Sequence, residues 1–145
     1  MEDNSEISDR TLLNVAREAR ENAFAPYSEF KVGASISTNL GVFAGANIEV
    51  SGRSTSVHAE MLAMFEAVFK GADEFYTMII SPQDQSGEVG PCGLCQHTIS
   101  QFTDELRILE DAGEDEVVEY WLSELIGDGY SASTRHFETI NDTSQ

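Results

Sequence analysis

The chain has 145 residues, a length that suits one domain with its own hydrophobic core, so we expect residues 1–145 to form a single domain. It carries 26 acidic and 8 basic residues, for a formal charge of −18, and such a surface repels phosphate backbones. This composition argues against nucleic acid as a partner. No apolar run of about 18 residues could span a bilayer, and the acidic first residues do not resemble a secretory signal. We therefore expect a cytoplasmic protein that makes no membrane contact.

The acidic residues are spread along the whole chain, and Lys31 and Lys70 are its only lysines. At molar salt, charges are screened within about 3 Å, which removes most of the repulsion between them. The pattern favours a protein from a halophile. An ordinary acidic cytoplasmic protein is the alternative.

Residues 8–24 carry apolar side chains near helical spacing, with Ser8 as a candidate N-cap and Pro26 beyond the end, and they predict a helix. The next two runs, residues 31–38 and 41–50, favour β-structure and are separated by turn residues. These runs predict a hairpin.

A second helix is expected from about residue 56 to 70, where Gly71 follows as a stop signal. Residues 75–81 read as a short buried strand. A third helix is predicted at 94–102, with a C-x-x-C pair in its first turn.

Two more strands are predicted at 106–111 and 116–121, separated by four residues. So short a connection favours antiparallel pairing, because a parallel crossover needs a dozen residues or more. The prediction is therefore a five-stranded sheet flanked by helices, without repeats or linkers. The polar tail from about residue 131 is left unassigned.

His58, Cys92 and Cys95 all fall at the starts of predicted helices, so they can meet above one end of the sheet. Imidazole and thiolates suit zinc, and three protein ligands leave a fourth position for water, as in catalytic sites. A structural four-cysteine site is excluded because the chain has only two cysteines. If His58 is not a ligand, Cys92 and Cys95 could instead form a redox dithiol.

Glu60 follows His58 by two residues, and side chains two apart on a regular helix point in different directions. We therefore expect Glu60 to take a proton from the metal-bound water instead of binding the metal. The spelling His58-Ala59-Glu60 followed by Pro91-Cys92-Gly93-Leu94-Cys95 matches H-x-E…P-C-x-x-C, the pattern of zinc nucleobase deaminases.

From about residue 8 to 126 the chain resembles the short, homotetrameric type of cytidine deaminase. The resemblance is carried by four segments, residues 25–36, 45–49, 58–68 and 90–102. It implies an α/β fold, a three-layer α/β/α sandwich with a five-stranded mixed sheet, and one Zn²⁺ per subunit. It also implies hydrolytic deamination of cytidine and deoxycytidine to uridine and deoxyuridine, a reaction of pyrimidine salvage.

Carried over by position, the resemblance makes Phe30 a wall of the pyrimidine site and Ala59 a backbone contact to the base. Asn47 and Glu49 would bind a ribose hydroxyl, and Glu60 the ring nitrogen. An amide and a carboxylate at alternate positions of a strand end point the same way, and can hold one hydroxyl as donor and acceptor. Such a pair favours a nucleoside over the free base.

The sequence departs from the pattern of many short members at four positions. His58 replaces a cysteine, while Met61 and Gln96 stand where arginines are common. Three thiolates leave a site one charge too negative, and a histidine ligand removes the excess that arginines would offset. Arg53 replaces a loop aromatic, which leaves the substrate preference open.

Two other functions remain open on the sequence. One is a related deaminase that acts on a modified or antibiotic aminonucleoside such as blasticidin S. The other is a zinc-binding interaction module without catalysis, which is disfavoured because a structural zinc site calls for four ligands. The family resemblance predicts a closed homotetramer, with a dimer as the alternative.

Overall fold

The computed structural model describes residues 7–52 and 55–126. Within these ranges the chain forms four helices and five strands. In order they are α1 (Asp9–Arg20), β1 (Val32–Thr38), β2 (Gly41–Ala46), α2 (Ala59–Phe69), β3 (Phe75–Pro82), α3 (Gly93–Ser100), β4 (Arg107–Asp111), β5 (Val117–Trp121) and α4 (Leu122–Ile126).

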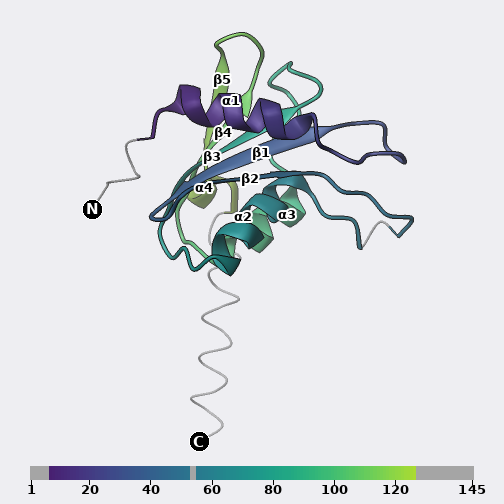
Figure 1. The fold of residues 1–145 in the computed structure, drawn as a ribbon. Helices are drawn as coiled ribbons and strands as arrows, with labels where there is room; N and C mark the ends of the chain where they lie inside the picture. The colour runs from purple at the N-terminus through teal and green to yellow at the C-terminus, as the bar shows by residue number, and fades with distance from the viewer. Residues whose placement is uncertain (1–6, 53–54, 127–145) are drawn as a thin grey trace, which may run out of the picture.

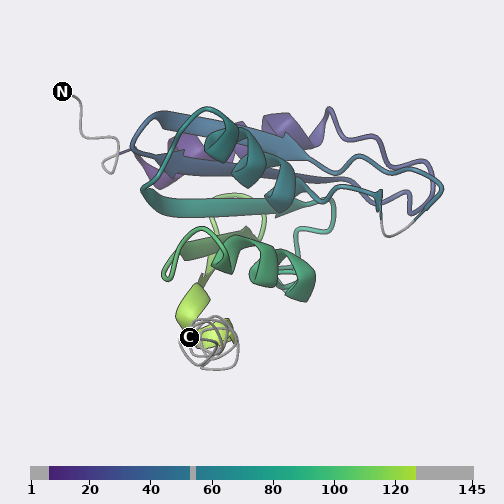
Figure 2. The ribbon, with the colours of Figure 1, turned by 90° about the horizontal axis from the view of Figure 1, so that it is seen from below.

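The five strands form one sheet in the order β2-β1-β3-β4-β5. Strands β3 and β4 are parallel, whereas the other three neighbouring pairs are antiparallel. Helix α1 covers one face of the sheet, and α2 and α3 cover the other (Figures 1 and 2). The predicted three-layer α/β/α arrangement with a mixed sheet is confirmed.

The predicted hairpin is formed by β1 and β2, with Thr38 paired to Gly41 across a tight turn. The Thr38 hydroxyl donates to the Gly41 carbonyl at 2.9 Å and accepts from the Leu40 N–H at 3.0 Å. Gly41 has a φ of 107°, a backbone conformation that side chains disfavour. Local turn chemistry therefore sets the register of this pair.

Helix α1 begins as predicted, because the Ser8 hydroxyl accepts from the Thr11 N–H at 3.1 Å and caps the first turn. Its predicted end near residue 24 was wrong, since the helix stops at Arg20. The Phe24 N–H instead donates to the Asn47 carbonyl at 2.9 Å. Pairing with a distant segment thus overrides the helical pattern after Arg20.

Two glycines let helices pack directly on the sheet backbone. A methyl group on Gly33 of β1 would lie 2.1 Å from the Ala16 carbonyl oxygen of α1. One on Gly45 of β2 would lie 2.5 Å from the Ala63 nitrogen of α2. These close approaches fix the positions of α1 and α2 relative to the strands. For α2, they also fix where the helix begins.

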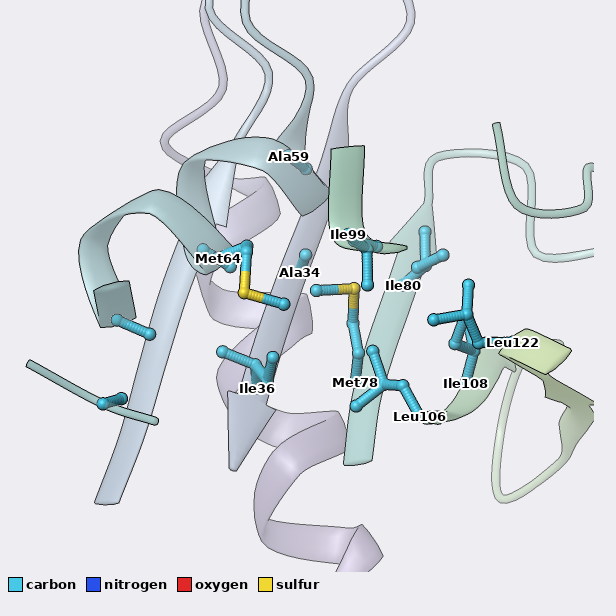
Figure 3. Close-up of a cluster of buried hydrophobic side chains, with 13 residues drawn as sticks. Ala34, Ile36, Ala59, Met64, Met78, Ile80, Ile99, Leu106, Ile108 and Leu122 are labelled. Carbon is cyan, nitrogen blue, oxygen red and sulfur yellow. The ribbon is translucent and has the colours of Figure 1, made fainter. Parts of the chain in front are cut away.

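The sheet separates two apolar cores. The core under α1 is small, and its buried members are Leu12, Leu13, Ala16, Ile79 and Leu109. The core on the other face is larger, and Figure 3 shows part of it between α2, α3 and the strands, including Ala59, Met64, Ile80, Ile99 and Ile108. Both faces of the central strands are therefore buried, as continuous apolar strands require.

The end of the described chain returns beside β4. Strand β5 pairs antiparallel with β4, as the four-residue connection predicts. Helix α4 was not predicted, and its first residue, Leu122, is fully buried in the larger core. No helix within residues 7–52 and 55–126 has the length and apolar character needed to cross a membrane. The polar tail from residue 131 lies outside the described residues.

Candidate active site

Three predicted ligands converge where α2 and α3 begin. His58 and Cys92 are the N-cap residues of these helices, both with extended backbone, and Cys95 lies in the first turn of α3. Their donor atoms all lie within 4.8 Å of one another. The Cys95 Sγ and the His58 Nδ1 are 3.3 Å apart. The three side chains therefore form a potential metal site.

The donor set fits zinc. Zinc with one imidazole and two thiolate ligands in tetrahedral geometry places these donors roughly 3.5–3.8 Å apart, close to the spacing here. Burial raises the pKa of the Cys95 thiol well above its usual range, and the charge of Glu60 adds to the rise. A buried thiol beside a carboxylate needs a cation to ionise, and Zn²⁺ held by these three residues would supply that charge.

Glu60 lies beside the three donors and is not a member of the group. It sits in the first turn of α2 with 4% of its surface exposed, and its carboxylate interacts with the Cys95 thiol. Because His58 precedes the helix, the helical geometry assumed for this pair from the sequence does not apply to it. Both side chains nevertheless line the same cavity.

A cavity of about 720 Å³ opens above the donor group. It is lined by residues from four separate segments, within residues 27–32, 47–51, 56–60 and 80–92. Seven of the eight residues predicted for the site line it, namely Phe30, Asn47, Glu49, His58, Ala59, Glu60 and Cys92. Cys95, the eighth, is 1% exposed and belongs to the donor group at its base.

Asn47 follows the end of β2, and its side chain forms hydrogen bonds with the backbone of residues 30 and 32. Its amide donates to the Phe30 carbonyl at 2.9 Å, and its carbonyl oxygen accepts from the Val32 N–H at 2.9 Å. These bonds hold Phe30 half-buried at the cavity wall. A third interaction of the Asn47 side chain is with the Glu49 carboxylate, and it helps to lower the pKa of Glu49.

Glu49 lies two residues further on and also holds the loop that precedes β1. Its carboxylate accepts from the Tyr27 and Ser28 N–H groups, each at 3.0 Å, and from the Ser28 hydroxyl. The Ser28 hydroxyl, followed by the backbone N–H groups, lowers the pKa of Glu49. Glu49 is thus an anion at neutral pH, suited to accept a hydrogen bond from a ligand hydroxyl.

Ala59 is 1% exposed and is the first residue of α2. The N–H groups of the first helical turn have no intrahelical acceptor, so they are available to partners outside the helix. Ala59 lines the cavity between His58 and Glu60.

Two positions that depart from the family pattern have different surroundings. Met61 is 9% exposed and belongs to the core. The Gln96 amide donates to the Pro91 carbonyl at 2.9 Å and so ties α3 to the loop that leads into Cys92. Arg53 lies outside the described residues.

Several cavity residues were missed by the reading of the sequence. Tyr27 and Ser28 line the cavity, and their N–H groups donate to Glu49. Val89 and Gly90 form the cavity wall before Cys92. Ser28 lies within residues 25–36, one of the segments that carry the family resemblance, so its hydroxyl could have been predicted to take part in the site. Val89 and Gly90 carry no such signal, because an apolar residue and a glycine in a loop indicate no particular chemistry.

Comparison with known proteins matches these features to one family. The model of the cytidine and deoxycytidylate deaminase zinc-binding region matches residues 6–109, a span that includes all three metal donors. A cytidine deaminase of Sporosarcina psychrophila is 39% identical over 92 residues, which cover 63% of this chain and 67% of that protein. A cytidine deaminase of Halalkalibacterium halodurans is 30% identical over 133 residues, 90% of this chain and 96% of that protein.

A solved structure gives the same result. The crystal structure of a cytidine deaminase from Burkholderia pseudomallei is similar with a TM-score of 0.78 and 32% identity, over 84% of this chain and 98% of that one. Fold and donor set together define a zinc-dependent hydrolytic deaminase. The chain belongs to the cytidine deaminase family.

Proposed function

We propose that this enzyme hydrolyses cytidine and deoxycytidine to uridine and deoxyuridine, as a step of pyrimidine salvage. One observation carries the proposal: a single cavity joins the donor group and Glu60 to the polar pair Asn47 and Glu49. The part of the cavity with the donor group and Glu60 suits deamination of a base. The part with Asn47 and Glu49 suits binding of the hydroxyls of a sugar.

His58, Cys92 and Cys95 would hold the Zn²⁺, one ion per subunit. Bound in this way, zinc supplies a nucleophile at neutral pH by lowering the pKa of water. Glu60 accepts the proton that water loses and delivers it to the ring nitrogen of the base. It then accepts the remaining proton of the oxygen added at C4 and passes it to the departing amino group, so that the C4–N bond breaks, ammonia leaves and the added oxygen becomes a carbonyl.

The remaining predicted residues would orient the substrate. Phe30 contacts the pyrimidine ring as an apolar wall, and the backbone of Ala59 binds the base. The side-chain amide of Asn47 and the carboxylate of Glu49, which interact with each other, bind one ribose hydroxyl. A cavity with these polar groups rejects free cytosine, because they would be left without partners.

The charge of the cavity favours a nucleoside over its 5′-phosphate. Among the described residues, the cavity lining contains the acidic side chains Glu49 and Glu60 and no lysine or arginine. A phosphate dianion entering this lining would meet repulsion with no cation to offset it. This supports cytidine and deoxycytidine as substrates in preference to deoxycytidylate.

The finer predictions on assembly and origin belong to the same proposal. We propose that residues 1–145 form one domain and that subunits associate as a homotetramer, or else as a dimer. Large apolar side chains on the surface, with Phe69 85%, Tyr27 63% and Leu94 59% exposed, support association. The formal charge of −18 supports a cytoplasm of high salt, as in a halophile.

A substrate panel tests the proposal. Zinc-loaded protein in high salt is incubated with cytidine, deoxycytidine, cytosine, deoxycytidylate and blasticidin S, and the loss of absorbance on deamination is followed. We expect turnover of the first two, with little reaction of cytosine and deoxycytidylate. Turnover of blasticidin S alone would move the function to an antibiotic deaminase, and turnover of none by zinc-loaded protein would refute deamination of these substrates.

A further inference from the structure

Glu110 is a carboxylate without an assigned purpose, on the strand that runs parallel to a wall of the cavity. It is 1% exposed and lies opposite Ile80 in the pairing of β3 with β4, and Ile80 lines the cavity. A buried carboxylate is costly unless hydrogen bonds satisfy its oxygens, so its partners indicate what it does.

Two of the three partners of Glu110 are backbone N–H groups from the loop before α3. Val89 donates to Oε2 at 3.0 Å and Gly90 donates to Oε1 at 2.9 Å. The Tyr120 hydroxyl of β5 also donates to Oε1, at 3.3 Å. All three groups are donors and a carboxylate only accepts, so the charged form of Glu110 matches this arrangement.

The loop held in this way leads directly to a metal donor. Gly90 has a φ of 75°, and it is followed by Pro91 and Cys92. Cys92 precedes α3 and has an extended backbone, so its Sγ is placed by the loop and not by the helix. Cys95, in contrast, lies within α3 and is fixed by packing at 1% exposure.

We propose that Glu110 is a positioning residue for the zinc site, which acts through the backbone of Val89 and Gly90 to hold Cys92 in place. Gln96 restrains the same stretch at the Pro91 carbonyl, so the approach to Cys92 is held from β4 and from α3. The inference rests on the proposed zinc site. It adds a role for a side chain that does not itself touch the metal or the substrate.

Exchange of one oxygen for an amide tests this role. In Glu110→Gln the NH₂ group must face at least one of the three donors, so a bond to the loop is lost at nearly constant volume. The matched control is Asp111→Asn, which alters the adjacent buried carboxylate on the opposite face of the sheet. Tyr120→Phe removes the phenol bond to Glu110 and leaves both bonds to the loop.

The readout is the rate at which the full-length zinc-loaded protein loses Zn²⁺ to a chelator such as EDTA, measured with the far-UV circular dichroism as a check of folding. We expect Glu110→Gln to raise this rate about tenfold, at the lower end of the effect of partners that orient ligands. Asp111→Asn and Tyr120→Phe should leave it near the wild-type value. With Co²⁺ in place of zinc, only Glu110→Gln should alter the thiolate-to-metal absorption.

Equal rates for Glu110→Gln and Asp111→Asn would overturn the inference while the proposed function stands, provided the wild type binds zinc and deaminates cytidine. A wild type that binds no zinc would overturn both. If Glu110→Gln fails to fold, hydrogen exchange of the wild-type Val89 and Gly90 amides decides. Slow exchange supports the proposal, and exchange at the rate of an unstructured amide overturns it.

Discussion

Glu110 and Asp111 are adjacent on β4 and are both buried, yet their side chains enter different layers of the molecule. Neighbouring strand residues face opposite sides of a sheet. Glu110 therefore shares the face of Ile108, which belongs to the core beneath α2 and α3. Asp111 shares the face of Leu109, which packs against α1.

The partners of the two carboxylates differ accordingly. Asp111 binds the Arg17 guanidinium with both oxygens, each at 2.8 Å, and also accepts from Ser81 and Gln85. Glu110 binds the loop that leads to Cys92. The same chemical group thus joins α1 to the sheet on one face and supports the active site on the other. Stability and chemistry can therefore be perturbed separately.

The largest effect is expected at the site face, from Glu60→Gln. The amide cannot accept a proton, so deamination should fall by about 10²–10⁴-fold, while zinc stays bound and the fold is kept. Glu66→Gln is the matched control, because Glu66 is an exposed glutamate on the same helix. Rates are followed by absorbance with cytidine. A near-normal rate for Glu60→Gln would remove Glu60 from proton transfer.

The opposite face should show the reverse pattern with Asp111→Asn. Arg17 would lose its charged partner, and breaking a buried ion pair costs about 3 kcal/mol of unfolding free energy. Zinc loss and deamination should stay unchanged. Asp115→Asn is the control, since the pair of Arg10 and Asp115 is exposed and is worth less than about 1 kcal/mol. Denaturant unfolding measures both, and equal losses would contradict the burial argument.

Asp111→Asn should also change how the stability of the protein depends on pH. Burial tends to raise the pKa of Asp111, but the hydrogen bond from Arg17, with those from Gly113, Ser81 and Gln85, lowers it below its usual value. The stability it contributes is then present above the unfolded pKa of about 3.9 and is lost as the pH falls below it. The stability difference between wild type and Asp111→Asn should therefore shrink below about pH 4.

The parts of the site that were predicted from sequence depend on local patterns. His58 and Cys92 stand directly before apolar helices, and Gly71 has the positive φ of 100° expected at a helix end. Helix α4 was missed because its five residues are too few to show a period.

The parts that were not predicted depend on contacts between distant segments. The bonds from Val89 and Gly90 to Glu110 join residues about twenty apart, and they exist because β3 and β4 run in parallel register. In the same way, the bonds of Asn47 to residues 30 and 32 follow from the hairpin register. Glu110 itself shows no pattern, because an acidic residue near a strand end reads as a solvated one.

The charge balance of the donor set gives the fourth prediction. His58→Cys should still bind zinc, but we expect deamination to fall about tenfold because a third thiolate leaves an excess negative charge. Adding Gln96→Arg should restore part of the loss, since Gln96 is half-buried beside the loop of Cys92. Met61→Arg should restore less, because Met61 is 9% exposed and the charge would enter the core.

Gln96→Arg in the wild-type background is the control for this pair of changes. There the ligand set is already balanced, and the substitution only removes the bond to the Pro91 carbonyl. We expect a small loss of activity. If the arginine lowers activity equally in both backgrounds, the charge account of the histidine ligand is wrong.

The smallest effect is expected at the N-cap of α1, because this helix takes no part in the proposed reaction. Ser8→Ala removes the acceptor for the Thr11 N–H and should cost about 1 kcal/mol, visible as a lower midpoint of thermal unfolding. Ser8→Asn restores a capping group without adding charge and should recover most of the loss. Zinc loss and deamination should not change, because α1 packs on the face of Asp111. A faster zinc loss in Ser8→Ala would show that the two faces are coupled through the sheet, and that stability on the α1 side also sets the geometry at Cys92.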